Sequence, residues 1–151
     1  MSPPNSAPPA MTEMRPVGFV RSPYTATDQI PKGPGAKHEA DGVLEILPEF
    51  GEGLKDIEGF SHLFVIWVFH RAEGYSLLAT PPTADRPHGV FATRSPRRPN
   101  PLGLTVVGLL QRDGLRLHVR GVDMLDGTPI LDIKPYLTSI PEQQLKRGWM
   151  T

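Results

Sequence analysis

Prolines and glycines divide this 151-residue sequence into short pieces. The chain contains 18 prolines and 15 glycines, and proline both lacks a backbone N–H and disfavours the helical conformation in the residue before it. This distribution favours a single, loop-rich and mainly β domain, which we assign to residues 16–140. Residues 1–15 are rich in Pro, Ser and Ala, so we expect a disordered N-terminal tail there and a C-terminal tail at 141–151.

The clearest strand signal is the apolar run HLFVIWVFH at 62–70. Its β-branched and aromatic residues predict a central strand that is buried on both faces. A hairpin is predicted farther along, because residues 104–110 lead to an Asp-Gly turn, after which apolar and polar residues alternate from 115 to 120. Short strands are also expected at 17–21 and 42–47.

Residues 48–57 contain the best helical pattern in the chain. Phe50, Leu54 and Ile57 are spaced by four and three residues, which predicts a short amphipathic helix. Gly51 and Gly53 weaken that helix, since glycine is a poor helix former.

The overall composition excludes several classes of site. The chain has no cysteine, which rules out disulfides, thiolate zinc sites and a thiol nucleophile. His62 and His70 bracket the apolar run without a second ligand at a familiar spacing, so no metal site is expected. Sixteen basic and sixteen acidic residues cancel, so any contact with nucleic acid must come from a local patch. With no apolar run of membrane-spanning length, we expect a cytoplasmic protein.

The segment RSPRRPNP at 94–101 places three arginines among three prolines. The prolines fix the backbone and predict a stiff, extended loop. Guanidinium groups held at defined positions suit phosphates, carboxylates or base edges. The alternative is a solvated turn whose charges only keep it soluble. The candidate residues for binding substrate or RNA are Arg97, Arg98 and Asn100.

Two further loops could bind a ligand. In the segment IPKGPGA at 30–36, glycines on both sides of a proline would let the main chain approach a ligand closely, although a tight connector explains them equally well. The segment DMLDGTP at 123–129 has two aspartates before a Gly-Thr turn. They could form local hydrogen bonds or accept hydrogen bonds from hydroxyl or amino groups of a ligand.

Several sequence blocks occur in one order between residues 17 and 136 and together resemble a known family. They are GFVRSPY at 18–24, GFSHL at 59–63, GVFATRS at 89–95, RPNPLG at 98–103, LDGTP at 125–129 and DIKPY at 132–136. A series of blocks is far more specific than a single motif. The pattern resembles the TrmO (TsaA-like) family of tRNA methyltransferases.

This resemblance implies an antiparallel β-barrel that works as a homodimer. It also implies S-adenosylmethionine as the methyl donor and N6 of adenosine 37 in tRNA, carrying a threonylcarbamoyl group, as the acceptor. The sequence lacks a G-x-G-x-x-G motif after a strand, which agrees with a cofactor site unlike that of Rossmann-type methyltransferases. Two alternatives stay open: the same barrel acting on a small molecule, and a non-catalytic barrel that senses S-adenosylmethionine or binds RNA.

The resemblance also assigns residues. The expected cofactor contacts are Gly33, Pro34, Gly35, Phe69, His70, Arg94, Leu104, Asp123, Met124, Leu125 and Asp126. Within the arginine loop, we expect Arg94 to face inward and Arg97 and Arg98 to face outward. No residue is assigned to remove the proton from the acceptor. The best-known bacterial members continue into a further C-terminal region beyond the point that corresponds to 141–144, so the acceptor remains open between tRNA and a small molecule.

Overall fold

We describe a computed structural model of the chain, in which residues 10–33 and 35–150 are placed. Most of the expected N-terminal tail (1–9), the candidate site residue Pro34 and Thr151 lie outside the described residues. Among the described residues, no helix is both long and apolar enough to cross a membrane.

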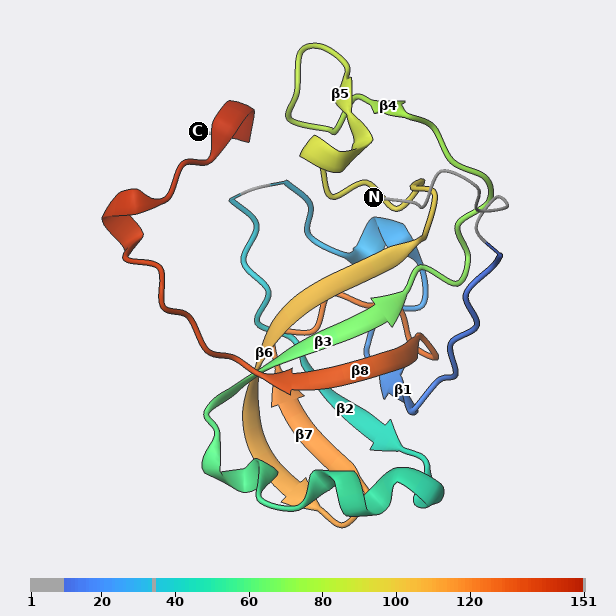
Figure 1. The fold of residues 1–151 in the computed structure, drawn as a ribbon, viewed down its shortest axis with the longest axis vertical. Helices are drawn as coiled ribbons and strands as arrows, with labels where there is room; N and C mark the ends of the chain where they lie inside the picture. Colours follow the sequence, from blue (N-terminus) through green and yellow to red (C-terminus); the bar gives the residue numbers. More distant parts are fainter. Residues whose placement is uncertain (1–9, 34, 151) are drawn as a thin grey trace, which may run out of the picture.

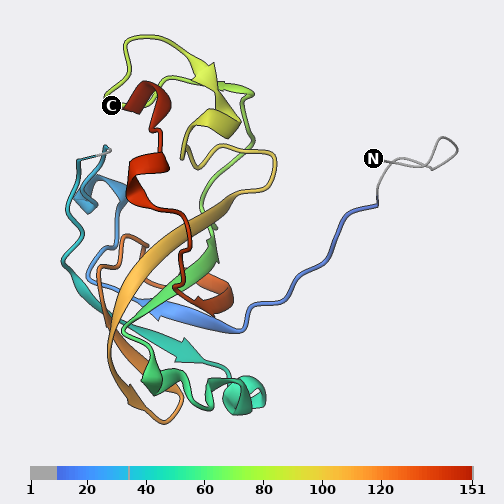
Figure 2. The same cartoon turned by 60° about the vertical axis from the view of Figure 1, so that its left-hand side comes forward.

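Six antiparallel strands form a closed barrel in the order β1-β2-β7-β6-β3-β8 (Figures 1 and 2). The strands are β1 (Gly18–Arg21), β2 (Asp41–Ile46), β3 (His62–Val68), β6 (Leu102–Asp113), β7 (Arg116–Arg120) and β8 (Pro129–Pro135). A separate two-stranded sheet joins β4 (Leu78–Ala79) to β5 (His88–Gly89). The predictions of a mainly β fold, of strands near 17–21, 42–47 and 62–70, and of a hairpin after residue 104 are therefore confirmed.

The strands of the barrel differ in how many residues they pair. Pairing is extensive along β3 and short between β1 and β8. Strand β3 pairs with β6 through seven residue pairs, whereas β1 pairs with β8 only at Gly18↔Ile130 and Phe19↔Pro129. Additional main-chain bonds extend that short seam, since the Val17 amide donates to the Ile130 carbonyl at 2.7 Å and the Val20 amide donates to the Thr128 carbonyl at 2.9 Å.

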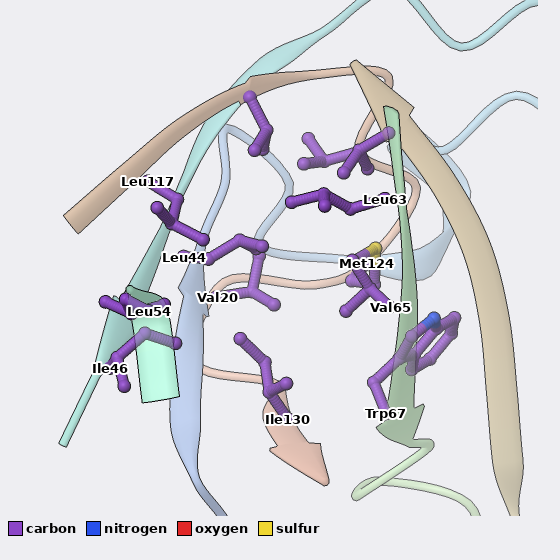
Figure 3. Close-up of a cluster of buried hydrophobic side chains, with 13 residues drawn as sticks. Val20, Leu44, Ile46, Leu54, Leu63, Val65, Trp67, Leu117, Met124 and Ile130 are labelled. Carbon is purple, nitrogen blue, oxygen red and sulfur yellow. The ribbon is translucent and has the colours of Figure 1, made fainter. Parts of the chain in front are cut away.

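Alternate residues of each strand fill the barrel (Figure 3). The core contains side chains from all parts of the wall, including Val20, Leu44, Leu63, Val65, Trp67, Leu117 and Ile130. Burying a side chain such as Leu63, which is 0% exposed, stabilises the fold by about 2 kcal/mol.

The prediction that the central strand is buried on both faces is wrong. Leu63, Val65 and Trp67 are buried, but the residues between them are only half-buried. The reason is the closure of the sheet: one face of β3 fills the interior of the barrel while the other lies on its outer surface.

One end of the barrel is covered by two 3₁₀ helices in place of the predicted helix at 48–57. These are η2 (Pro48–Leu54) and η3 (Ile57–Gly59), at the bottom of Figure 1. Asp56, with a φ of 72°, separates them, and a left-handed residue ends a helix. Leu54 is still buried against the core, so the amphipathic pattern predicted the packing correctly and the helix type wrongly.

The opposite end of the barrel carries the long loops (Figures 1 and 2). They contain η1 (Thr27–Gln29), the β4–β5 sheet and η4 (Val90–Ala92). The C-terminal segment, with η5 (Glu142–Gln144) and η6 (Gly148–Met150), also reaches this end. There the Trp149 indole donates a hydrogen bond to the Ala92 carbonyl at 2.8 Å and stacks on His88 with ring centroids 4.2 Å apart.

Candidate functional site

The loop-bearing end of the barrel brings together several of the predicted cofactor contacts. Phe69, directly after β3, donates its amide to the Pro101 carbonyl at 2.8 Å. The Arg94 guanidinium donates to the Leu104 carbonyl at 3.3 Å. These bonds hold the arginine loop against the start of β6. Phe69, Arg94 and Leu104, which are far apart in sequence, therefore lie close together at this end of the barrel.

The arginine loop is oriented differently from the prediction. Arg98, expected to face outward, is half-buried, and its Nη1 donates to the carbonyls of Thr93 at 2.8 Å and Ser95 at 3.1 Å. The prolines of this segment remove backbone donors, and the Arg98 guanidinium supplies donors to the loop's own carbonyls instead. Arg94, expected to face inward, is exposed, as are Arg97 and Asn100.

The segment from Asp123 to Asp126 is braced by the chain that follows β1. The Ser22 hydroxyl donates to the Met124 carbonyl at 2.6 Å, and the Ser22 amide donates to Asp126 Oδ1 at 3.1 Å. The Asp126 amide donates to the Tyr24 carbonyl at 2.7 Å. Thus the sequence block at 18–24, to which no site role was assigned, fixes the shape of a predicted binding segment.

The four residues of that segment differ in what they can offer a ligand. The side chain of Met124 is fully buried and that of Leu125 is 8% exposed, so both would reach a ligand mainly through backbone atoms. Asp123 and Asp126 are half-buried. These two carboxylates are suited to accept hydrogen bonds from amino or hydroxyl groups.

Asp123 is linked to the core of the barrel by side chains that the sequence analysis did not identify. The Thr105 hydroxyl donates to Asp123 Oδ1 at 2.5 Å, and the Trp67 indole N–H donates to the Thr105 hydroxyl at 3.0 Å. No motif signals this connection, since a threonine in an apolar strand looks like any β-branched wall residue. The bond joins residues 18 positions apart in the sequence.

The predicted glycine turn has different neighbours. Gly33 has a φ of 94°, and a Cβ on it would lie 3.0 Å from the Thr83 side chain. The described part of this turn therefore packs next to the loop before β5. Gly35 and His70 are exposed.

Charge pairs lie along the barrel wall, between Arg21 of β1 and Glu45 of β2 and between Arg120 of β7 and Asp41 of β2. The hydrogen bond that Arg21 donates to Glu45 raises the pKa of Arg21, and the attraction of Glu45 and Asp126 adds to this effect. The hydrogen bond from Arg120 lowers the pKa of Asp41. Both pairs are exposed, so they contribute little to stability. The described residues contain no cluster of three or more His, Cys, Asp or Glu side chains that could hold a metal ion.

Comparison with known proteins places this geometry in a family. Residues 19–141 match the model of the tRNA-methyltransferase O N-terminal domain. The chain is 47% identical over 143 residues to a protein of Pyrococcus abyssi named "Probable S-adenosyl-L-methionine-binding protein", covering 94% of this chain and 78% of the relative. It is 37% identical over 131 residues to the tRNA (adenine(37)-N6)-methyltransferase of Escherichia coli, covering 80% of this chain and 56% of that enzyme.

Solved structures agree. The crystal structure of TrmO from Pseudomonas aeruginosa superposes with a TM-score of 0.75 at 36% identity, over 93% of this chain and 63% of that one. The chain therefore spans less than two thirds of the E. coli and P. aeruginosa proteins, and nearly all of it is shared with them or with the archaeal relative. The match across most of the chain, in sequence and in fold, shows that it belongs to the tRNA-methyltransferase O family.

Proposed function

We propose that this chain is an S-adenosylmethionine-dependent methyltransferase that modifies N6 of adenosine 37 in tRNA, with threonylcarbamoyladenosine as the acceptor. The observation that carries the proposal is the convergence of Phe69, Arg94, Leu104 and Asp123 at the loop-bearing end of the barrel. This occurs in a chain whose E. coli and mouse relatives are both named tRNA (adenine(37)-N6)-methyltransferases.

The polar and apolar groups of this site fit the proposed cofactor. Asp123 and Asp126 are half-buried carboxylates, which can accept hydrogen bonds from the amino group and ribose hydroxyls of S-adenosylmethionine. Leu104, 48% exposed, and Phe69 offer apolar surface for its adenine ring. When bound, the cofactor supplies an electrophilic methyl group, and the protein's own contribution is to align donor and acceptor and exclude water.

The acceptor side of the proposal rests on local positive charge. The chain as a whole is neutral, yet Arg97 is exposed on a proline-stiffened loop. A cation at a fixed position suits a phosphate of an RNA strand. Exposed Asn100 on the same loop could add a hydrogen bond to a base or sugar. Since tRNA is the proposed acceptor, we expect the protein to act in the cytoplasm.

We also propose that the protein works as a homodimer through the outer face of β3 and β6. Leu102, Leu104 and Val106 are 41%, 48% and 39% exposed, and all three lie on the outer side of β6. Their cross-strand partners on β3 include Ile66 and Phe64, which are half-buried. This continuous apolar face has the composition of an interface between two copies of one chain. Leu104 belongs to both this face and the proposed cofactor site.

Two measurements test the proposed activity. Calorimetry should detect saturable binding of S-adenosylhomocysteine, and mass spectrometry of tRNA nucleosides should detect one added methyl group on threonylcarbamoyladenosine. Transcripts without the threonylcarbamoyl group serve as the control for substrate choice. A folded protein that binds no cofactor contradicts the methyltransferase proposal, whereas a protein that binds cofactor but leaves tRNA unmodified points to a small-molecule acceptor.

A further inference from the structure

Thr105 is an unusual residue for the interior of this barrel. It is 8% exposed and lies on β6 opposite Val65, which is 0% exposed. Of the other two buried threonines among the described residues, Thr93 donates to the Val90 carbonyl and Thr128 donates to the Leu125 carbonyl. Those bonds stabilise turns, whereas the Thr105 hydroxyl donates to the Asp123 carboxylate. A valine would have filled the same space without a polar group to satisfy.

The direction of the hydrogen bonds through Thr105 is fixed by chemistry. An indole N–H can only donate, so the Thr105 oxygen must accept from Trp67 at 3.0 Å. The single hydroxyl proton is then available for Asp123, 2.5 Å away. Asp123 therefore accepts this hydrogen bond through its Oδ1 atom.

Trp67 is itself held in one orientation. Its ring lies over Gly103, its partner in the β3–β6 ladder, and a Cβ at Gly103 would come within 2.3 Å of the ring. The indole also meets Phe69 edge-on, with ring centroids 4.3 Å apart and planes at 60°. Figure 3 shows Trp67 near the end of β3, with its nitrogen on the side away from Ile130. Trp67 belongs to strand β3, and its side chain is only 6% exposed, so it is packed within the barrel.

From this geometry we infer that Thr105 and Trp67 are positioning residues, which hold the Asp123 carboxylate in place as a hydrogen-bond acceptor for the methyl donor. The inference rests on the proposed function, because it takes Asp123 to contact the cofactor. Trp67 contacts Phe69 as well, so one buried indole supports two residues of the same site. The rigid barrel wall thus sets the orientation of a carboxylate that belongs to a loop.

The test is a double-mutant cycle with S-adenosylhomocysteine as the probe in calorimetry. Thr105→Val should weaken binding about tenfold, the effect of losing one hydrogen bond to a charged group. Asp123→Ala should weaken it at least as much. In the Asp123→Ala background, Thr105→Val should have no further effect, because its partner is gone.

Conservative variants show whether Thr105 and Trp67 affect binding through their hydrogen bonds or only through packing. Thr105→Ser keeps the hydroxyl and should bind the probe about as well as the original protein, within roughly twofold. Trp67→Phe removes the indole N–H while keeping a ring, and should weaken binding by a smaller factor than Thr105→Val; it also provides the test if Thr105→Val does not fold. Leu117→Ala is the packing control. It empties space on the far side of the core from Trp67 in Figure 3, so it should lower the melting temperature and leave the affinity unchanged.

The outcomes distinguish this inference from the proposal beneath it. If the unmodified protein binds no probe, the proposed function fails and the inference fails with it. If the protein binds, but folded Thr105→Val and Trp67→Phe both bind equally well, only the inference is overturned. An undiminished effect of Thr105→Val in the Asp123→Ala background also overturns it, since Thr105 would then act through another group.

Discussion

The barrel wall and the loop region at 69–101 are stabilised in different ways. The wall is held by regular main-chain pairing, with seven residue pairs between β3 and β6, and by a core in which Leu44, Leu63 and Val65 are 0% exposed. The loop region depends on isolated bonds, such as Val90 amide to Leu77 carbonyl at 2.8 Å and the two bonds from Arg98. This difference indicates that the wall contributes most of the stability, while the loop region depends on a few separate contacts. The proposed ligand contacts lie mainly in loops, and Trp67 in the wall packs against one of them, Phe69.

The largest expected effect comes from opening a cavity in the wall. Leu63→Ala should lower the free energy of unfolding by about 3 kcal/mol, because it removes a fully buried side chain from a closed barrel that cannot collapse around the gap. Leu77→Ala is the matched control in the loop region: Leu77 is 63% exposed, so its loss should cost less than about 0.5 kcal/mol. Denaturant unfolding measures both. Equal losses in the free energy of unfolding would show that the wall contributes no more to stability than the loop region does.

The next variant tests whether the outer face of β6 forms the proposed dimer interface. Val106→Asp places a carboxylate in the apolar face of β6, at a position 39% exposed in the single chain. Burial of an unpaired charge in a dimer interface should weaken association by about 2 kcal/mol or more. Sedimentation should then show monomers at concentrations where the original protein is dimeric, with an unchanged far-ultraviolet circular dichroism spectrum.

The control for this variant lies on the neighbouring strand β7, next to the hairpin that joins β6 to β7 and away from Val106. Arg116→Asp changes charge on β7, where Arg116 is exposed and its neighbours across the ladder are Glu45 and Asp113. It should leave association unchanged. A Val106→Asp protein that remains dimeric would exclude the outer face of β6 from the interface.

Arg94 should affect ligand binding without affecting the wall. Its guanidinium donates to the Leu104 carbonyl at the proposed cofactor site. Arg94→Ala should therefore weaken S-adenosylhomocysteine binding by about 1.4 kcal/mol, or tenfold, while the melting temperature stays within the error of the measurement. Calorimetry and thermal unfolding on the same sample test this; unchanged affinity would remove Arg94 from the proposed site.

The sequence predicted most strands of the wall, whereas it did not predict the contacts around the candidate site residues. Period-two alternation marks the β6–β7 hairpin because the buried and exposed sides of a strand differ in polarity. The prediction for β3 came from a continuous apolar run, in which the half-buried residues of the outer face cannot be told from core residues. Closure of the sheet is not encoded in local pattern.

The site was less predictable because its contacts join distant segments. Nothing local distinguishes an arginine that faces solvent from one that binds its own loop, so the expected outward orientation of Arg98 is wrong: it contacts the carbonyls of Thr93 and Ser95. Thr105 was missed because its partner Asp123 lies on another segment. The family resemblance points to Asp123, but not to Thr105 and Trp67, whose hydrogen bonds lead to it.

The smallest expected effect concerns Arg97, the arginine that the corrected loop geometry leaves as the best candidate for an RNA contact. Arg97 is exposed, and its backbone is fixed on both sides: its amide donates to the Ser95 hydroxyl at 3.3 Å and its carbonyl accepts from the Ser76 amide at 3.2 Å. Replacing it with alanine should therefore leave the loop intact and remove one cation. If that cation contacts a phosphate, the slope of log affinity for tRNA against log salt concentration should fall by roughly one unit. Arg116→Ala removes another exposed cation, next to the β6–β7 hairpin, and should not change the slope. Because long-range attraction would respond to both losses alike, only a difference between the two variants identifies a local contact, and identical slopes would assign Arg97 to the solvated surface.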